Sequence, residues 1–128
     1  MQTSFKQYLG TKGITPTNEI EGQITFLSDG LFYIFAYDNS DPYYFRIILP
    51  NVFQIVDNKS EYDSLVNELN QRFKVAKTYI VSNNTIWIAA EQFICTHEGL
   101  ELLFERCIAL LKFVIDYFRE RQSQLIHD

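Results

Sequence analysis

The sequence predicts an α+β fold in which helices pack on one face of an antiparallel sheet of about five strands. Short segments rich in Ile, Val, Phe and Tyr are separated by the turn-forming stretches SDG (28–30), NSDP (39–42) and NN (83–84), which is typical of hairpins. Before, between and after these segments, apolar residues recur at helical spacing. The expected order is therefore α-β-β-β-α-β-β-α.

The individual elements follow from these signals. A short helix is expected from Thr3 to Lys12, and a loop follows it. The stretches ITFL, LFYIFAYD and YYFRIIL are expected to be three successive strands, joined by a three-residue loop at SDG and a four-residue loop at NSDP. Residues 57–74 predict a helix capped by Asn58 or Ser60. KTYIVS and TIWIAAE then form a hairpin around a two-residue Asn-Asn turn, and a long helix runs from about Glu98 to Arg121.

Length and composition set the class of protein. The 128 residues suit a single domain, which we expect to comprise residues 1–128, and 47% hydrophobic residues is ordinary for a globular protein. No segment approaches the roughly 20 consecutive apolar residues of a membrane span, and the first residues lack the apolar run of a secretory signal. With no disulfide framework, Cys95 and Cys107 are expected to be buried thiols of a cytoplasmic protein.

The expected loop lengths assign the side chains of the first three strands to the two faces of the sheet. A four-residue loop at 39–42 places residues whose numbers sum to 81 opposite each other. In this register one face is aliphatic or Phe and is the predicted core: Ile24, Phe26, Phe32, Ile34, Ala36, Phe45, Ile47 and Leu49. The other face is rich in tyrosine and carries Tyr33, Phe35, Tyr37, Tyr44, Arg46 and Ile48. In the last hairpin, Ile80 is expected to oppose Trp87.

Two interpretations of the tyrosine-rich face are open. Aromatic residues are favoured on strands and often do no more than cover a sheet. Tyr and Arg are also enriched at the hot spots of protein interfaces. We therefore select the following residues of this face as a candidate partner-binding surface: Tyr33, Phe35, Tyr37, Tyr44 and Arg46.

The charge disfavours nucleic acid as the partner. The net charge is −5 and the isoelectric point is near 5.0, whereas phosphate binding relies on clustered Lys and Arg. Three aspartates, Asp29, Asp38 and Asp41, lie near Arg46 in the sequence. Exposed aromatic side chains of an RNA-binding sheet need basic neighbours, and the element order also differs from that of the RRM fold. We expect neither nucleic acid nor membrane as a partner.

No motif predicts catalysis, a metal or a cofactor. HEGLE at 97–101 begins like the zinc-protease motif HExxH, but Glu101 stands where the second histidine is required. The simpler interpretation is a helix start capped by Thr96. Cys107 lies among leucines and phenylalanines of the last helix, which predicts a core thiol rather than a nucleophile. We therefore expect no enzyme activity, no catalytic or metal-binding residues and no cofactor.

The terminal helix has more apolar surface than one sheet covers. Its charged residues gather in a narrow stripe, and a broad apolar face lies opposite. A further apolar shoulder consists of Leu102, Ala109, Phe113 and Tyr117. Either the first helix or a second copy of the chain would cover this surplus, so Leu102, Phe113 and Tyr117 join the candidate partner-binding surface and a homodimer is predicted.

Three features together resemble the YbjN-type bacterial proteins: the helix VNELNQRFK with its Asn67-x-x-Asn70 pair, the hairpin TYIVSNNTIWIAA and the long terminal helix. That family has a type III secretion chaperone-like fold. The resemblance implies a small cytoplasmic protein, often dimeric, that binds protein segments or modulates regulators and catalyses nothing. Asn67 and Asn70 could have a binding role, or they could equally be helix-surface residues that make local hydrogen bonds.

The leading hypothesis is thus a non-catalytic protein-binding module, chaperone-like or regulatory, that uses an aromatic and apolar surface. The alternative is a small-ligand-binding protein. Its pocket would lie between the sheet and the C-terminal helix and be lined by Tyr33, Tyr44 and Arg46. A closed cavity with a few convergent polar groups would favour this second hypothesis.

Overall fold

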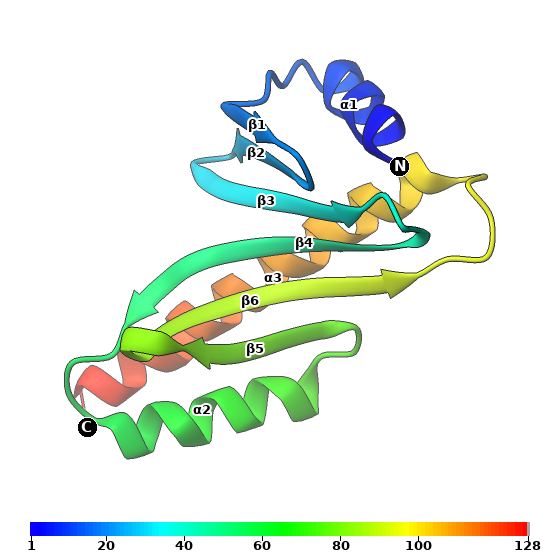
Figure 1. Ribbon diagram of the computed structural model, residues 1–128. Helices are drawn as coiled ribbons and strands as arrows, with labels where there is room; N and C mark the ends of the chain where they lie inside the picture. Colours follow the sequence, from blue (N-terminus) through cyan, green and yellow to red (C-terminus); the bar gives the residue numbers. More distant parts are fainter. Residues whose placement is uncertain (128) are drawn as a thin grey trace.

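The computed structural model describes residues 1–127, and their side chains as far as Leu125. Within this range the chain forms three α-helices, one 3-10 turn and an antiparallel six-stranded sheet in the order β1-β2-β3-β4-β6-β5 (Figure 1). The elements in chain order are α1 (Gln2–Thr11), β1 (Asn18–Ile20), β2 (Gln23–Ser28), β3 (Leu31–Asp38), β4 (Asp41–Gln54), α2 (Lys59–Arg72), β5 (Ala76–Val81), η1 (Ser82–Asn84), β6 (Thr85–Phe93) and α3 (Leu100–His127).

The predicted α+β class and element order are confirmed, with one strand more than expected. The additional strand β1 lies in the segment predicted to be a loop, and it pairs with β2 through a tight turn at Glu21 and Gly22. Gly22 has φ +86, and a Cβ there would lie 3.3 Å from the carbonyl oxygen of Tyr37. Both the left-handed backbone and this close approach favour glycine at the turn.

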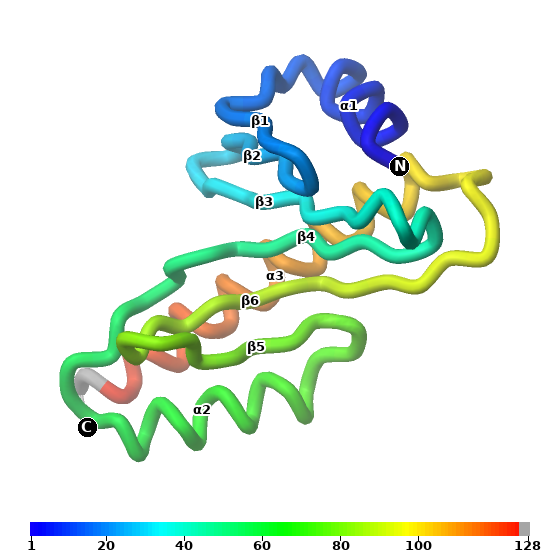
Figure 2. Tube along the Cα trace, in the orientation of Figure 1, coloured from blue at the N-terminus to red at the C-terminus, as the bar shows by residue number. Residues whose placement is uncertain are grey.

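The helices lie on one side of the sheet and along its β5 edge (Figure 1). Helix α3 runs behind the long strands β4 and β6. Helix α1 contacts α3, and α2 lies along β5 while also contacting α3. The chain trace shows β4 leading directly into α2 at one end of the sheet, and β6 leading into α3 at the other (Figure 2). The opposite face of the sheet is left without a helix in the described chain.

An aromatic cluster forms the centre of the core between α1, α3 and the sheet. The Phe5 ring of α1 stacks on the Phe35 ring of β3, with centroids 3.9 Å apart and planes 4° apart. The Phe104 ring of α3 meets Phe5, Phe35 and Phe45 edge-on, at centroid distances of 4.9, 5.5 and 5.1 Å. All four side chains are fully buried, and edge-to-face and offset packing are the favoured aromatic geometries.

The predicted register of the first hairpin is wrong by one residue. Ser28 pairs with Leu31, so the loop contains two residues, Asp29 and Gly30, with φ of 51° and 79°. Two positive φ values are the signature of the type I′ turn, for which Asp-Gly is a preferred sequence. The shorter loop places Phe26 opposite Tyr33 and therefore moves Tyr33 to the core face.

The second hairpin shows the same kind of shift. Its loop is the two-residue Asn39-Ser40, where the Asp38 carboxylate accepts hydrogen bonds from both the amide and the hydroxyl of Ser40. Beyond an irregularity next to the loop, Tyr37 pairs with Phe45, so the numbers of two paired residues sum to 82 rather than the predicted 81. The alternation of side chains then reverses for β3 while β4 keeps its predicted faces.

The burial of β3 follows from this shift. Tyr33, Phe35 and Tyr37, predicted on the tyrosine-rich face, are buried in the core instead. Phe32, predicted in the core, is 56% exposed, and Ile34 and Ala36, also predicted there, lie on the face opposite the helices. The other predicted core residues of the sheet, Ile24, Phe26, Phe45, Ile47 and Leu49, are buried as expected, as are Leu65, Leu69, Phe104, Leu111 and Ile115.

In the last hairpin the loop is three residues long instead of two. Val81 pairs with Thr85, and Tyr79 rather than Ile80 opposes Trp87. Asn83 and Asn84 do adopt the positive φ expected of them, 69° and 55°. The helix ends also differ slightly from expectation, because α3 begins at Leu100, after Gly99, and Thr96 instead accepts the Glu98 amide in a turn before the helix.

Asn70 of α2 has a defined structural role. Its side-chain amide accepts the Thr78 backbone N–H at 2.8 Å and donates to the Thr78 carbonyl at 2.9 Å. Thr78 is 2% exposed and lies on β5, the edge strand of the sheet. The amide therefore takes the place of a neighbouring strand and protects this edge from pairing with another chain.

Candidate functional site

The helix-free face of the sheet is the main candidate surface, and we call it the outer face. Strand pairing places together the residues that alternate with the core on β3, β4, β6 and β5. They are Phe32, Ile34, Ala36, Tyr44, Arg46, Ile48, Lys77, Tyr79, Trp87, Ala89, Glu91 and Phe93. Ile48 and Ala89 are 3% and 0% exposed although no described helix covers them, so the larger side chains around them exclude water. The outer face thus has an apolar floor.

A polar and aromatic group lies over this floor at Arg46. Arg46 of β4 is directly paired with Glu91 of β6, and Lys77 of β5 forms an ion pair of 3.5 Å with Glu91. Burial, followed by the nearby charge of Glu91, raises the pKa of the Tyr44 hydroxyl. Burial also raises the pKa of Tyr79, against the lowering effect of Arg46. The two tyrosines therefore flank the guanidinium and the carboxylate closely enough to sense both charges.

The guanidinium of Arg46 is available to a partner. Among the side chains described, it takes part in no hydrogen bond and no ion pair, although it is only partly exposed. It borders a depression of about 330 Å³ that is also lined by Tyr44 and Ala36 and, towards the β3–β4 loop, by Asp38 and Asp41. A half-buried guanidinium with free N–H groups is suited to a carboxylate, which it binds with two parallel hydrogen bonds.

Sequence reasoning missed Trp87 and Tyr79 as members of this surface. They form a directly opposed pair, with ring centroids 6.3 Å apart. The indole N–H of Trp87 is buried without a hydrogen-bond partner in the described chain. The presence of the single tryptophan on a strand was the available signal, since Trp is enriched at interfaces, but the one-residue error in hairpin register paired it with Ile80.

The structure separates the predicted β3 residues from the rest of the candidate surface. Tyr33, Phe35 and Tyr37 lie within the core, so their predicted place on a partner-binding surface is wrong. Burial raises the pKa of the Tyr33 hydroxyl, which has no hydrogen-bond partner among the described residues. Tyr44 and Arg46 do lie on the outer face as predicted.

The predicted shoulder of α3 forms a second exposed surface, on the other side of the molecule. Leu102 is 65% exposed and Phe113 is 68% exposed, so α1 does not cover them. Phe113 meets the Phe73 ring edge-on at 6.2 Å. Tyr117 is partly buried and donates a hydrogen bond of 2.6 Å to Glu68, which is also bound by Arg121. Tyr117 therefore connects α3 to α2, whereas Leu102 and Phe113 are free to contact a partner.

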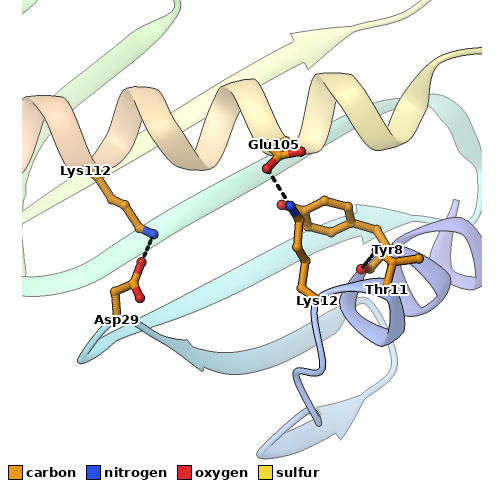
Figure 3. A network of polar contacts seen from close by, with 6 residues as sticks. All are labelled: Tyr8, Thr11, Lys12, Asp29, Glu105 and Lys112. Carbon is orange, nitrogen blue, oxygen red and sulfur yellow. Dashed lines mark hydrogen bonds and ion pairs between the residues drawn. The ribbon is translucent and has the colours of Figure 1, made fainter.

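A cavity of about 480 Å³ lies between the end of α1, the β2–β3 turn and α3. Figure 3 shows two ion pairs formed by residues that line it. Lys12 lies 2.6 Å from Glu105, and Lys112 pairs with Asp29 of the turn. The pairing raises the pKa of Lys12 through its hydrogen bond to Glu105 and lowers the pKa of Asp29 through its hydrogen bond to Lys112.

The predicted ligand pocket does not form. Of its three predicted residues, Tyr33 is in the core on the helix side, whereas Tyr44 and Arg46 lie on the outer face. The cavity that does occur between the sheet and α3 is lined by other residues, which include Tyr8, Ile14, Leu27 and Ile108. Sequence reasoning missed it because Lys12 and Asp29 are far from α3 along the chain.

Among the described side chains, His97, Cys95 and Cys107 belong to no cluster of metal ligands. His97 lies before α3, where its Nε2 is 2.7 Å from the carbonyl oxygen of Pro42. Cys107 is buried as predicted, and burial raises its pKa to about 11. Cys95 is exposed, so its predicted burial is wrong. In the part of the chain with described side chains, no three His, Cys, Asp or Glu residues gather as metal ligands would.

Among the described helices, none combines the length and the apolar character required to traverse a bilayer. No protein-family model and no curated protein sequence matches the chain. A solved structure does match it: the crystal structure of YbjN from E. coli, named as a candidate transcription regulator. The TM-score is 0.68 at 11% sequence identity, and the match covers 95% of this chain and 93% of that one. The chain therefore has a YbjN-like fold.

Proposed function

We propose that this protein is a non-catalytic protein-binding module, regulatory or chaperone-like, and that the outer face of its sheet contacts the partner. One observation carries the proposal: no described helix covers the outer face, and this face presents Tyr44 and Tyr79 near Arg46, with Trp87 opposite Tyr79. Trp, Tyr and Arg are the residues most enriched at interface hot spots.

The chemistry of the outer face favours a partner segment that combines apolar side chains with a carboxylate. Phe93, which is 80% exposed on the outer face, and the partly exposed ring of Trp87 would contact the apolar side chains. Arg46 has no ion-pair partner among the described residues and would bind the carboxylate, while Lys77 already neutralises Glu91. The net charge of −5 argues against direct contact with phosphates, so a regulatory role would act through protein contacts.

The match to YbjN supports the same class of function. That protein is named as a candidate transcription regulator, and a regulator can act by contacting another protein through such a surface. The 11% identity supports the fold, whereas the partner must be argued from the outer face of this chain.

A comparison of variants on the two sides of the molecule tests the proposal. Wild-type protein and the variants Arg46→Glu, Tyr79→Ala and Arg106→Glu are immobilised, and proteins captured from the extract of the native cell are quantified. We expect Arg46→Glu and Tyr79→Ala to lose proteins that wild type retains. Arg106→Glu makes the same charge reversal at an exposed residue of α3 outside the outer face, so it serves as the matched control and should retain them. An identical set of captured proteins for all four forms would contradict the proposal.

A further inference from the structure

The cavity beside α3 has the volume of a small-molecule site. Its volume of about 480 Å³ lies within the roughly 300–1,000 Å³ of typical ligand pockets. Four apolar residues, Ile14, Leu27, Ile108 and Ala109, line it together with polar groups. A lysine and a carboxylate form an ion pair towards each end of the cavity. These pairs are Lys12–Glu105 and Lys112–Asp29 (Figure 3).

The charges of the cavity select the class of ligand. Two lysines and two carboxylates balance each other, so a molecule with a large net charge gains little there. A molecule that carries both an ammonium and a carboxylate group can pair with both kinds of residue, and the apolar residues between the ends suit an apolar middle.

The spacing of the charged residues on α3 sets the length of the ligand. Glu105 and Lys112 belong to the same helix and are seven residues apart, which is about 10 Å along the axis. An extended chain of three amino acids also spans about 10 Å between its ends. Their partners Lys12 and Asp29 lie outside regular secondary structure, so they can move aside more easily than residues on the helix.

Exposure indicates the orientation. The side chain of Asp29 is 74% exposed, whereas that of Lys112 is 33% exposed. Water therefore competes strongly for Asp29, and a ligand carboxylate that enters from the cavity can replace it on Lys112. The ammonium end would then pair with Glu105 at the other end of the cavity.

We propose that this cavity binds a short zwitterion with an apolar middle, of about the length of a free tripeptide. Its carboxylate pairs with Lys112 and its ammonium group pairs with Glu105. This site is separate from the outer face and shares no residue with it. A test of this site is therefore independent of the proposed protein-binding function.

Titration of ¹⁵N-labelled protein with the tripeptide Leu-Ala-Leu tests the site. We expect saturable amide shifts around residues 12, 29 and 105–112, with a Kd of about 1 mM or tighter. The same peptide with an acetylated amino end and an amidated carboxyl end has neither charge, so it should bind at least about tenfold more weakly.

Variants of one ion pair give opposite expected results. Lys112→Gln should weaken tripeptide binding about tenfold or more, because it removes the residue that holds the carboxylate. Asp29→Asn should tighten binding by up to about fivefold, because it removes the competitor for Lys112. Glu101→Gln, on an exposed residue of the same helix, is the control and should leave the Kd unchanged.

Each contrary result overturns the proposal. The ion pairs would be structural clamps alone if no saturable shifts occurred, if the capped peptide bound as tightly as the free one, or if Lys112→Gln and Asp29→Asn lowered affinity alike. Thermal unfolding of each variant, measured beside the titration, confirms that the compared proteins are folded.

Discussion

Replacing Phe35 with alanine is the most direct test of the sheet register. Phe35 is fully buried, stacks on Phe5 at 3.9 Å, and lies within 6 Å of Phe45, Phe104 and Tyr37 by ring centroids. Truncation of a buried Phe costs about 3–5 kcal/mol, since transfer energy is lost and a cavity remains. Aromatic pairs add about 0.5–1.5 kcal/mol each beyond burial, so we expect the upper part of this range, about 4–5 kcal/mol.

Phe32→Ala is the matched control, because it makes the same chemical change three residues earlier on the same strand. Phe32 is 56% exposed on the outer side of the sheet, and we expect a loss of about 1 kcal/mol or less. Urea unfolding followed by circular dichroism gives the free energy of unfolding for both variants. Phe35→Leu keeps the comparison measurable if the alanine variant is too unstable, given a total stability of about 5–15 kcal/mol.

The register predicted from the sequence is the reverse: it places Phe32 in the core and Phe35 on the opposite face of the sheet. A large loss for Phe32→Ala with a small loss for Phe35→Ala would refute the structural register. The Phe5–Phe35 contact allows a further check by a double-mutant cycle. We expect a coupling energy of about 0.5–1.5 kcal/mol, which would be absent if the rings did not stack.

Four further predictions concern other parts of the molecule. Asn70→Ala should lower the free energy of unfolding by about 1–3 kcal/mol in urea titrations, because it leaves buried backbone groups of β5 without partners. An alkylating reagent should label Cys95 in the folded protein and Cys107 only after unfolding, as mass spectrometry of the peptides can show. Hydrogen bonds from Arg121 and then Tyr117 lower the pKa of Glu68 below the ordinary value of 4.5. The ionised Glu68 therefore contributes to stability above pH 4.5, and this contribution is lost as the pH falls through the lowered pKa. Glu68→Gln should reduce the loss of stability at acid pH, as measured by unfolding at a series of pH values. Light scattering should give a mass near twice the 15.1 kDa chain, and Phe113→Glu should restore the monomer if the α3 shoulder forms the contact.

The sequence by itself determined the kinds and order of the helices and of every strand except the short β1. Helical spacing located α1, α2 and α3, and turn-forming residues separated the strands, because these signals are local. The apolar stripe of α3 and the burial of Cys107 followed from the same periodicity. The exclusion of a complete HExxH motif at Glu101 needed only the identity of one residue.

Tertiary structure decided which side of each strand faces the helices. Every hairpin loop differed by at least one residue from the expected length, and a shift of one residue reverses the faces of a strand because side chains alternate with a period of two. The stretch LFYIFAYD is apolar or aromatic at nearly every position, so its own pattern does not select a face. The choice came from Phe5 and Phe104, distant in sequence, whose rings pack on Phe35 and leave Phe32 outside.

Strand register also explains which residues of the candidate sites could be predicted from the sequence and which could not. Tyr44 and Arg46 were placed on the correct face because β4 kept its alternation despite the altered loop. Tyr79 and Trp87 joined them only through the actual pairing of β5 with β6. The cavity beside α3 was beyond reach of the sequence, since it depends on the docking of α1 and of the β2–β3 turn against a helix about one hundred residues further along the chain, a non-local packing that no local pattern encodes.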